Sequence, residues 1–158
     1  MRYLLFGLVF AGQLTTDTVL GFVIAHAVAE PPGDADAFVR EILRKHPPAP
    51  FTLWRFTACE MELAGVTLSP RTPLLVDIEG INEGTAGPDL AFGAGPHFCI
   101  GAQLARVELV AVVEVLAADF PDARVTVPPA ELRQVRAADV QQGARLELLP
   151  VRLRPAVG

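Results

Sequence analysis

The sequence predicts a mainly α-helical fold with small β-sheets (α+β), and three observations lead to this prediction. Residues 3–29 and 102–119 are long, apolar segments that end at prolines, as core helices do. Residues 35–45 follow a capping aspartate and also stop at prolines. Residues 51–78 instead hold short β-like runs separated by turn signals. With 158 residues, the chain has the length of one domain, 1–158.

The first predicted helix occupies most of the segment 1–30. The Pro-Pro-Gly sequence at 31–33 ends it, because proline has no amide proton and clashes with the preceding turn. At about 1.5 Å per residue the helix would be roughly 40 Å long. It is apolar nearly all round, so we expect it to be buried or in lipid. Asp34 is the predicted N-cap of the second helix, 35–45, which the prolines at 47–48 end.

Short paired strands are predicted within residues 51–78. The candidate runs are 51–57, 61–68 and 73–78, with a Ser-Pro-Arg turn at 69–71. Their lengths favour small sheets over one large sheet.

The remaining chain is predicted to contain one more helix and a β-rich tail. Residues 81–89 hold glycine, proline and asparagine and are predicted to be a loop. The third helix runs from about 102 to 119, and we expect it to be central because apolar residues cover most of its circumference. In the tail, 120–158, the stretches 124–127 and 145–149 are compatible with a C-terminal hairpin.

The composition excludes one class of partner and suggests others. Hydrophobic residues make up 51% of the chain and the mean hydropathy is +0.39, which is high for a soluble protein. This excess suggests a bound cofactor, self-association or a partner chain. The formal net charge is −5 and the 13 basic residues are scattered, so we expect no nucleic-acid partner.

The cysteines and the N-terminus bear on the compartment. Cys59 and Cys99 allow at most one disulfide, which fits a reducing cytoplasm better than a disulfide-rich secreted scaffold. An exported protein with a cleaved leader is the alternative, because residues 3–12 are apolar and 25–27 have the A-x-A form of a cleavage site. Four polar residues within 13–17 interrupt the apolar run, so we expect neither a leader nor a membrane span.

The stretch FGAGPHFCIGAQLAR, residues 92–106, has the composition of a ligand-binding loop. Cys99 comes just before the third predicted helix, whose dipole favours the thiolate, the form that ligates metals or attacks electrophiles. Gly93, Gly95 and Gly101 let the backbone turn tightly and approach a flat partner closely. A buried cysteine beside a glycine-rich turn is the alternative for a short Cys-x-Gly pattern.

The full pattern F-G-x-G-x-H-x-C-x-G-x-x-L-A-R resembles the haem-ligand signature of the cytochrome P-450 family in its soluble bacterial form. The resemblance implies that Cys99 is the axial thiolate ligand of the iron in haem b and pushes electron density onto it. Phe92 would pack beside the sulfur, and His97 would reach a haem propionate. Gly93 would let the backbone come close to the porphyrin, and Gly101 would let the helix pass it.

Two further motifs resemble the family before the cysteine loop. Glu41 and Arg44 match its Glu-x-x-Arg pair, which is a buried structural clamp in the family; an ordinary surface pair at this spacing contributes only a few tenths of a kcal/mol. Arg55 stands where the family has an arginine that meets a haem propionate, and its charge-assisted hydrogen bonds would orient the porphyrin. A solvated strand residue is the alternative for Arg55.

The first helix and the tail also resemble the family. Residues 11–16, AGQLTT, resemble the oxygen-binding groove of the long distal helix, with Ala11 and Gly12 against the haem and Gly12 making room. The Thr15 hydroxyl would help to deliver protons during oxygen activation; packing within the helix is the alternative. The tail resembles the closing β-hairpin region.

The sequence departs from the family in four ways. It begins at the distal helix, so we expect a truncated member without most substrate-recognition segments. Leu14 stands where the family has an acid, which would impair proton delivery. Residues 31–41 leave little room for a helix that the family inserts there. Residues 80–90 replace a longer meander that supplies a second arginine to the clamp, so we expect Glu41 and Arg44 to form a lone buried pair.

Two functions remain open at this point. The resemblance implies a haem-thiolate monooxygenase that takes electrons from a ferredoxin or flavoprotein reductase and inserts one atom of dioxygen into a small organic substrate. The alternative is a catalytically impaired haem-binding or haem-free remnant that acts as a binding module or as a non-redox isomerase or cyclase. Leu14 and the shortened loops favour this alternative.

Overall fold

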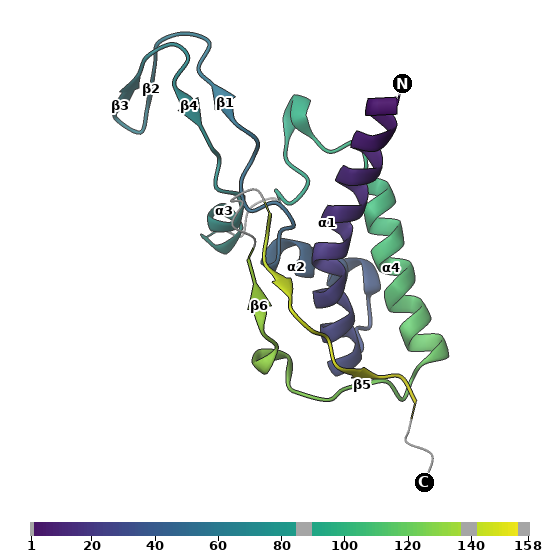
Figure 1. The fold of residues 1–158 in the computed structure, drawn as a ribbon. Coiled ribbons are helices and arrows are strands. Elements are labelled where there is room, and N and C mark those ends of the chain that lie inside the picture. Colours follow the sequence, from purple (N-terminus) through teal and green to yellow (C-terminus); the bar gives the residue numbers. More distant parts are fainter. Residues whose placement is uncertain (1, 85–89, 137–141, 155–158) are drawn as a thin grey trace.

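Two long helices form the centre of the molecule. The computed structural model describes residues 2–84, 90–136 and 142–154. Helices α1 (Arg2–Ala29) and α4 (Ala102–Asp119) lie side by side (Figure 1), and α2 (Ala35–Lys45) packs against both. The described strands form four short two-stranded sheets. The predicted α+β fold class is confirmed.

The helices end where the sequence predicts. No helix lies between α1 and α2, because residues 30–34 contain the Pro-Pro-Gly stop. The Asp34 side chain caps α2 by accepting a hydrogen bond of 3.0 Å from the Ala37 amide. Helix α4 ends at a cap in which the Phe120 amide donates to the Leu116 carbonyl.

Only the second half of α1 is buried, so the expectation that the whole helix lies inside the protein is wrong. Residues 2–13 are exposed, and Tyr3 reaches 93% exposure. The helix is long and apolar enough to cross a membrane by length and composition, but its second half belongs to the protein core. The first half has no cover from the described part of the chain. The buried side chains of α1 are those of Thr18, Val19, Phe22, Val23, Ala25, Ala27 and Val28.

The core joins the three long helices. Burying a Val, Leu, Ile or Phe side chain contributes about 1.5–3 kcal/mol, and eight such residues join Ala27 in one cluster. Only one face of helix α4 packs in the core, where Leu109 and Val113 are buried. Its other apolar residues, Leu104, Val107 and Val115, are exposed. The cluster comprises Val19, Phe22, Val23, Ala27, Val39, Ile42, Leu43, Leu109 and Val113.

Two small sheets form a projection away from the helices (Figure 1). Strand β1 (Arg55–Phe56) pairs with β4 (Pro73–Leu74), and β2 (Met61–Leu63) pairs with β3 (Val66–Leu68), both antiparallel. The predicted run 61–68 is therefore a hairpin and not one strand. Ala64 and Gly65 make its turn with positive φ of 51° and 79°, as a two-residue hairpin loop of this hand requires.

A short helix, α3 (Ile78–Gly84), replaces the first part of the predicted loop 81–89. Asp77 starts it: its Oδ1 accepts a hydrogen bond from the Gly80 amide at 2.8 Å, and its carbonyl accepts from the Ile81 amide. Residues 85–89 lie outside the described residues. The aspartate cap was the signal for this helix.

The C-terminal strands pair differently from the predicted hairpin. Strand β5 (Arg124–Val125) pairs with β8 (Val151–Arg152), and β6 (Gln134–Val135) pairs with β7 (Arg145–Leu146). Both predicted stretches thus contain a strand, but they do not pair with each other. Single 3₁₀ turns lie at Gly95–His97 and Pro129–Glu131.

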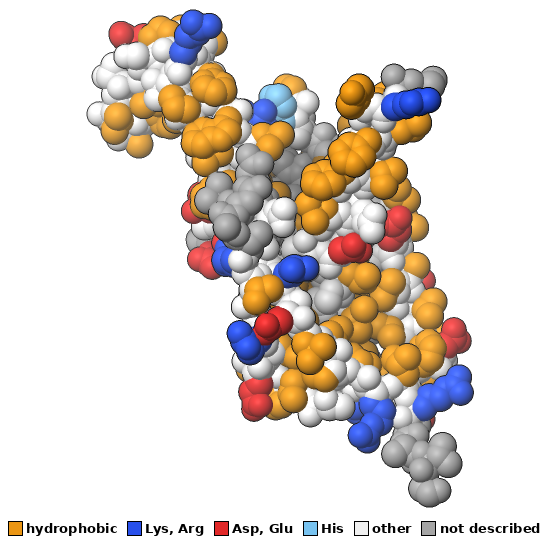
Figure 2. All heavy atoms as spheres, viewed as in Figure 1, with side chains coloured by type: hydrophobic (Ala, Val, Ile, Leu, Met, Phe, Trp, Pro, Cys, Tyr) orange, Lys and Arg blue, Asp and Glu red, His pale blue; other side chains and the backbone are white. Residues whose placement is uncertain are grey.

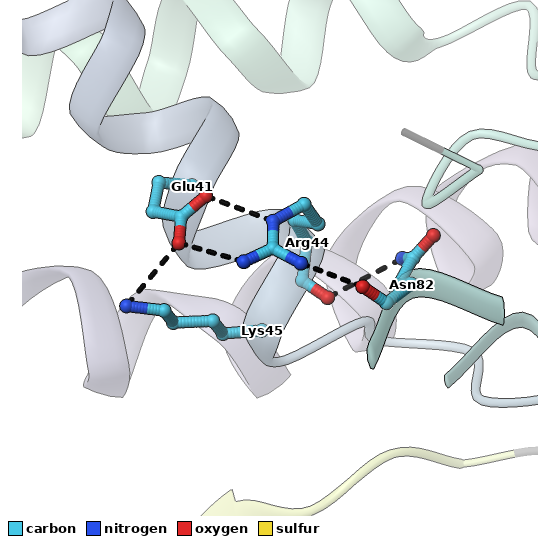
Figure 3. Close-up of polar contacts among 4 residues, drawn as sticks. All are labelled: Glu41, Arg44, Lys45 and Asn82. Carbon is cyan, nitrogen blue, oxygen red and sulfur yellow. Dashed lines mark hydrogen bonds and ion pairs between the residues drawn. The ribbon is translucent and has the colours of Figure 1, made fainter. Parts of the chain in front are cut away.

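The Glu-x-x-Arg pair is joined by Asn82, so the expectation of a lone buried pair is wrong. Arg44 donates to both carboxylate oxygens of Glu41 at 2.9 Å, and Lys45 lies 3.2 Å from the same carboxylate (Figure 3). Arg44 Nη1 also donates to the Asn82 carbonyl at 2.6 Å, while Asn82 Nδ2 donates to the Arg44 carbonyl. The hydrogen bonds from Arg44 and then Lys45 lower the pKa of Glu41 to about 2. The group ties α2 to α3.

Replacing Asn82 should destabilise the fold. Its side chain is buried, donates to Arg44 and accepts from the Leu90 amide at 3.3 Å. Asn82→Ala leaves these groups unpaired, so we expect a loss of about 1–3 kcal/mol in the free energy of unfolding, measured by urea denaturation. Gln103→Ala, at an exposed position of α4, is the control. An equal effect of both variants would contradict the role of Asn82.

Two histidines meet where α2 ends beside α1. The His46 ring stacks on Phe22 with centroids 3.9 Å apart, and the His26 ring lies 6.0 Å from His46. Burial lowers the pKa of His46 to about 4; His26 and Lys45 act in the same direction, and Glu79 opposes them. Burial also lowers the pKa of His26. Both imidazoles are therefore held neutral in the fold.

Acid should destabilise the protein through His46. Because its pKa in the fold lies below its ordinary value of 6.5, the unfolded chain binds more protons, and stability is lost as the pH falls from about 6.5 towards 4. We expect the thermal unfolding midpoint to drop between about pH 7 and pH 5, and His46→Gln to weaken this dependence. His97→Gln, at an exposed histidine, should keep the dependence of the unsubstituted protein. Identical profiles for all three proteins would refute this assignment.

Candidate functional site

One cavity brings together all nine candidate site residues from the sequence. Its volume is about 1070 Å³, at the upper end of the range for small-molecule and cofactor pockets. Its walls come from α1, the segment around β1, the cysteine loop and the start of α4. Several lining side chains are exposed, so the cavity opens to solvent. The nine residues are Ala11, Gly12, Thr15, Arg55, Phe92, Gly93, His97, Cys99 and Gly101.

The cysteine loop is held by its own backbone. The Cys99 amide donates to the Phe92 carbonyl at 2.9 Å, which brings the two ends of the loop together. The rings of Phe92 and Phe98 lie 6.5 Å apart and are tilted by 58°. Gly93 has a positive φ of 73°, and a Cβ there would lie 3.1 Å from the His97 carbonyl oxygen. Position 93 therefore requires glycine for both backbone conformation and space.

Cys99 lies just before α4, as predicted. Its carbonyl accepts a hydrogen bond from the Ala102 amide at 3.3 Å, and Gly101 is the N-cap residue of the helix. A Cβ at Gly101 would lie 3.8 Å from Cys99 Sγ, so glycine leaves that side of the sulfur open. Cys99 is free and exposed, which contradicts the alternative of a buried structural cysteine. Cys59 is also free and lies far away on the β1–β2 connection.

Helix α1 contributes a different wall of the cavity. The Thr15 hydroxyl donates to the Ala11 carbonyl at 2.6 Å, and its oxygen keeps lone pairs that can accept another hydrogen bond. A Cβ at Gly12 would meet open space, so this turn of α1 leaves room in the cavity. Leu14 places no ionisable group beside Thr15.

Two basic side chains line the same cavity. Arg55 is half-buried in β1, where it pairs with Leu74 of β4, and His97 is exposed in the cysteine loop. A guanidinium and an imidazole can each donate to a carboxylate. Arg55 is thus a strand residue directed at the cavity rather than a fully solvated one.

Arg106, the last residue of the signature, has a structural position. It does not line the cavity; its Nη2 donates to Asp36 Oδ1 at 2.5 Å. This hydrogen bond is the main cause that lowers the pKa of Asp36, and Arg40 adds to it. Arg106 therefore ties the first turns of α4 to the first turn of α2.

The cavity also has lining residues that sequence reasoning missed. Glu108 lies one turn after Leu104 and Ala105, so helical spacing from the signature was a signal for it. Asp17 lies one turn after Gln13 on α1 in the same way. No helical spacing predicts that residues 51–53 line the cavity, because the chain there is irregular. The missed residues include Gln13, Thr16, Asp17, Phe51, Thr52, Leu53 and Glu108.

Comparison with known proteins identifies the family. The chain is 47% identical over 174 aligned positions to the cytochrome P-450 monooxygenase DoxA of Streptomyces sp. (strain C5), which covers 96% of the chain. The chain belongs to the cytochrome P-450 family. It is also 35% identical over 136 positions to the erythromycin C-12 hydroxylase of Saccharopolyspora erythraea, over 70% of the chain. No protein-family profile matches it.

The match to the P-450 family is partial in length and close in fold. The chain spans 40% of the length of DoxA, in its C-terminal part. The solved structure of CYP154A1 from Streptomyces coelicolor A3(2) superposes with a TM-score of 0.80 at 28% identity, over 91% of this chain and 42% of that one. The alignment with DoxA is longer than the chain itself, so DoxA has residues within this region that the chain lacks.

The cavity residues fit the cofactor of the P-450 family, haem b with a cysteine thiolate as axial ligand. No three His, Cys, Asp or Glu side chains gather as a metal site in residues 2–84, 90–136 and 142–154. A single free cysteine is a sufficient protein ligand where a porphyrin already binds the iron. Arg55 and His97 can each donate a hydrogen bond to one of the two propionates, and Gly12 and Gly93 leave space.

Adding a side chain at position 93 should strain the cysteine loop. Gly93→Ala forces an L-residue into the left-handed region and brings its Cβ against the His97 carbonyl, so we expect a loss of about 1–2 kcal/mol in stability, measured by urea denaturation. Gly33→Ala is the matched control, since nothing lies within 4 Å of its Cβ position. Equal stability of the two variants would show that the loop does not depend on this conformation.

Proposed function

We propose that this chain holds haem b with Cys99 as the axial thiolate and forms the haem-binding part of a haem-thiolate monooxygenase. The observation that carries the proposal is the shared cavity: Cys99 and Thr15, from elements far apart in sequence, line it together with Arg55 and His97. These side chains supply a thiolate, a hydroxyl and two carboxylate partners to one space.

Each group has a separate task in this proposal. Haem, when bound, supplies the iron that activates dioxygen. Cys99 binds that iron from the N-terminal end of α4, whose dipole stabilises negative charge on sulfur. Arg55 and His97 orient the macrocycle by donating to its carboxylates. Phe92 would pack beside the sulfur.

Thr15 is the proposed proton-holding residue. Its hydroxyl proton is directed at the Ala11 carbonyl, which leaves the oxygen free to accept from a water or a ligand in the cavity. Leu14 offers no proton, so the chain does not place the usual acid next to this hydroxyl. We therefore expect slow proton delivery relative to family members with the acid.

The remaining functional assignments follow from family membership. We propose a ferredoxin or flavoprotein reductase as the electron donor, a small organic molecule as the substrate, and a cytoplasmic location. The relatives that support a small-molecule substrate include the erythromycin C-12 hydroxylase, which by its name acts on erythromycin.

Replacement of Cys99 tests the haem ligand. We expect the haem-loaded, reduced chain to give the carbon monoxide difference band of a thiolate-ligated haem, and Cys99→Ser to abolish it because serine supplies no thiolate. Cys59→Ser is the control, because Cys59 does not line the cavity, and it should leave the band unchanged. Equal effects of the two substitutions would refute the assignment. Haem binding without oxygen consumption in the presence of a reductase would instead favour the impaired remnant.

A further inference from the structure

The exposed half of α1 carries an aromatic stripe that the proposed function does not use. Tyr3, Phe6 and Phe10 are 93%, 69% and 54% exposed, and the rings of Phe6 and Phe10 stack with centroids 5.8 Å apart. None of the three lines the cavity. At about 100° per residue they share a helix face with Gln13 and Asp17, which do line it. The aromatic stripe therefore continues this face of α1 beyond the edge of the cavity.

A second apolar surface lies on the other side of the cavity, around β1. Leu53, Trp54 and Phe56 are 66%, 53% and 64% exposed. Strand β1 pairs with β4 on one edge, and no other described strand covers its second edge. Figure 2 shows apolar side chains on both projecting parts of the molecule, with a hollow between them. We call Leu53, Trp54 and Phe56 the β1 surface.

We propose that the aromatic stripe and the β1 surface are the docking site for one polypeptide that has the N-terminal part of the P-450 fold. The chain matches the C-terminal part of its relatives, so more than half of their length belongs to the same fold but has no counterpart among these residues. A polypeptide that spans both surfaces would also close the open side of the cavity. The proposal rests on the proposed function only for the reason to close the cavity. The contacts at the two surfaces do not depend on haem binding.

The size of the two surfaces favours this occupant over a second copy of the chain. A stable interface buries roughly 800 Å² on each partner, and an aromatic side chain supplies about 150–250 Å². Because these side chains are only partly exposed, the aromatic stripe alone falls well short of this area, while both surfaces together approach it. Two copies paired stripe to stripe would leave the β1 surface and the cavity uncovered.

The burial of the second half of α1 favours a polypeptide over a membrane as the partner. Helix α1 is long and apolar enough to cross a bilayer by length and composition, but from Thr18 onwards it is buried in the protein core. A helix half that packs inside the fold does not also face lipid.

Co-expression tests the proposal. The 158-residue chain is produced with the part of DoxA from Streptomyces sp. (strain C5) that lies outside the match, and the mass is measured by light scattering after size exclusion. We expect a one-to-one complex, weakened about tenfold or more by the double variant F6E/F10E, because aromatic anchors carry most of the binding energy. Val66→Glu, at a 58% exposed position of the β2–β3 hairpin, should leave the complex intact. Circular dichroism checks that each variant is folded.

Several outcomes would overturn the proposal: no complex, a complex insensitive to F6E/F10E, a dimer of the chain alone that F6E/F10E dissociates, or co-sedimentation of the chain with phosphatidylcholine–phosphatidylglycerol vesicles. The haem assignment is tested independently of the docking site. Cys99→Ser should still form the complex, since the contacts need no thiolate. A complex without the thiolate band would refute the proposed function and support the interface; the band without a complex would do the reverse.

Discussion

The packing of the second half of α1 against α4 positions every other part of the site. Val19, Phe22 and Val23 meet Leu109 and Val113 in one buried cluster that also receives α2. Because Thr15 lies one turn before Val19 and Cys99 lies just before α4, this contact brings the hydroxyl and the sulfur to the same cavity. The Arg106–Asp36 hydrogen bond adds a polar tie between α4 and α2. The proposed haem ligand, Cys99, is thus placed by apolar packing at some distance from it.

Helix α1 serves three environments along its length. Its second half is core, most residues within 8–17 line the cavity, and the start of the helix carries the aromatic stripe. An amphipathic pattern is therefore absent, because almost every position faces an apolar environment in the core or is proposed to do so in a complex. This explains why a helix that reads as uniformly apolar has half of its residues exposed here.

Several local features followed from the sequence because neighbouring residues alone decide them. Proline stops and the Asp34 cap determined the ends of the three long helices, and a contiguous signature located the cysteine loop. Features that depend on one unusual dihedral or one cap were missed: the Ala64-Gly65 turn inside an apolar run, and α3 behind Asp77. The strand pairing of the tail was also mispredicted, because the partners are separated in sequence and their stretches are only two residues long.

The sequence by itself determined the residues of the proposed haem site: a cysteine loop with its glycines, a threonine on a long helix, and two basic residues. The tertiary structure decided which of these residues share a cavity and which side chains are paired or exposed. It gathered nine of them around one cavity, gave Arg44 the partner Asn82 and left the first half of α1 exposed. Local backbone preferences and short motifs are encoded in adjacent residues. The side of a helix that is covered depends on packing between distant segments, which no local pattern specifies.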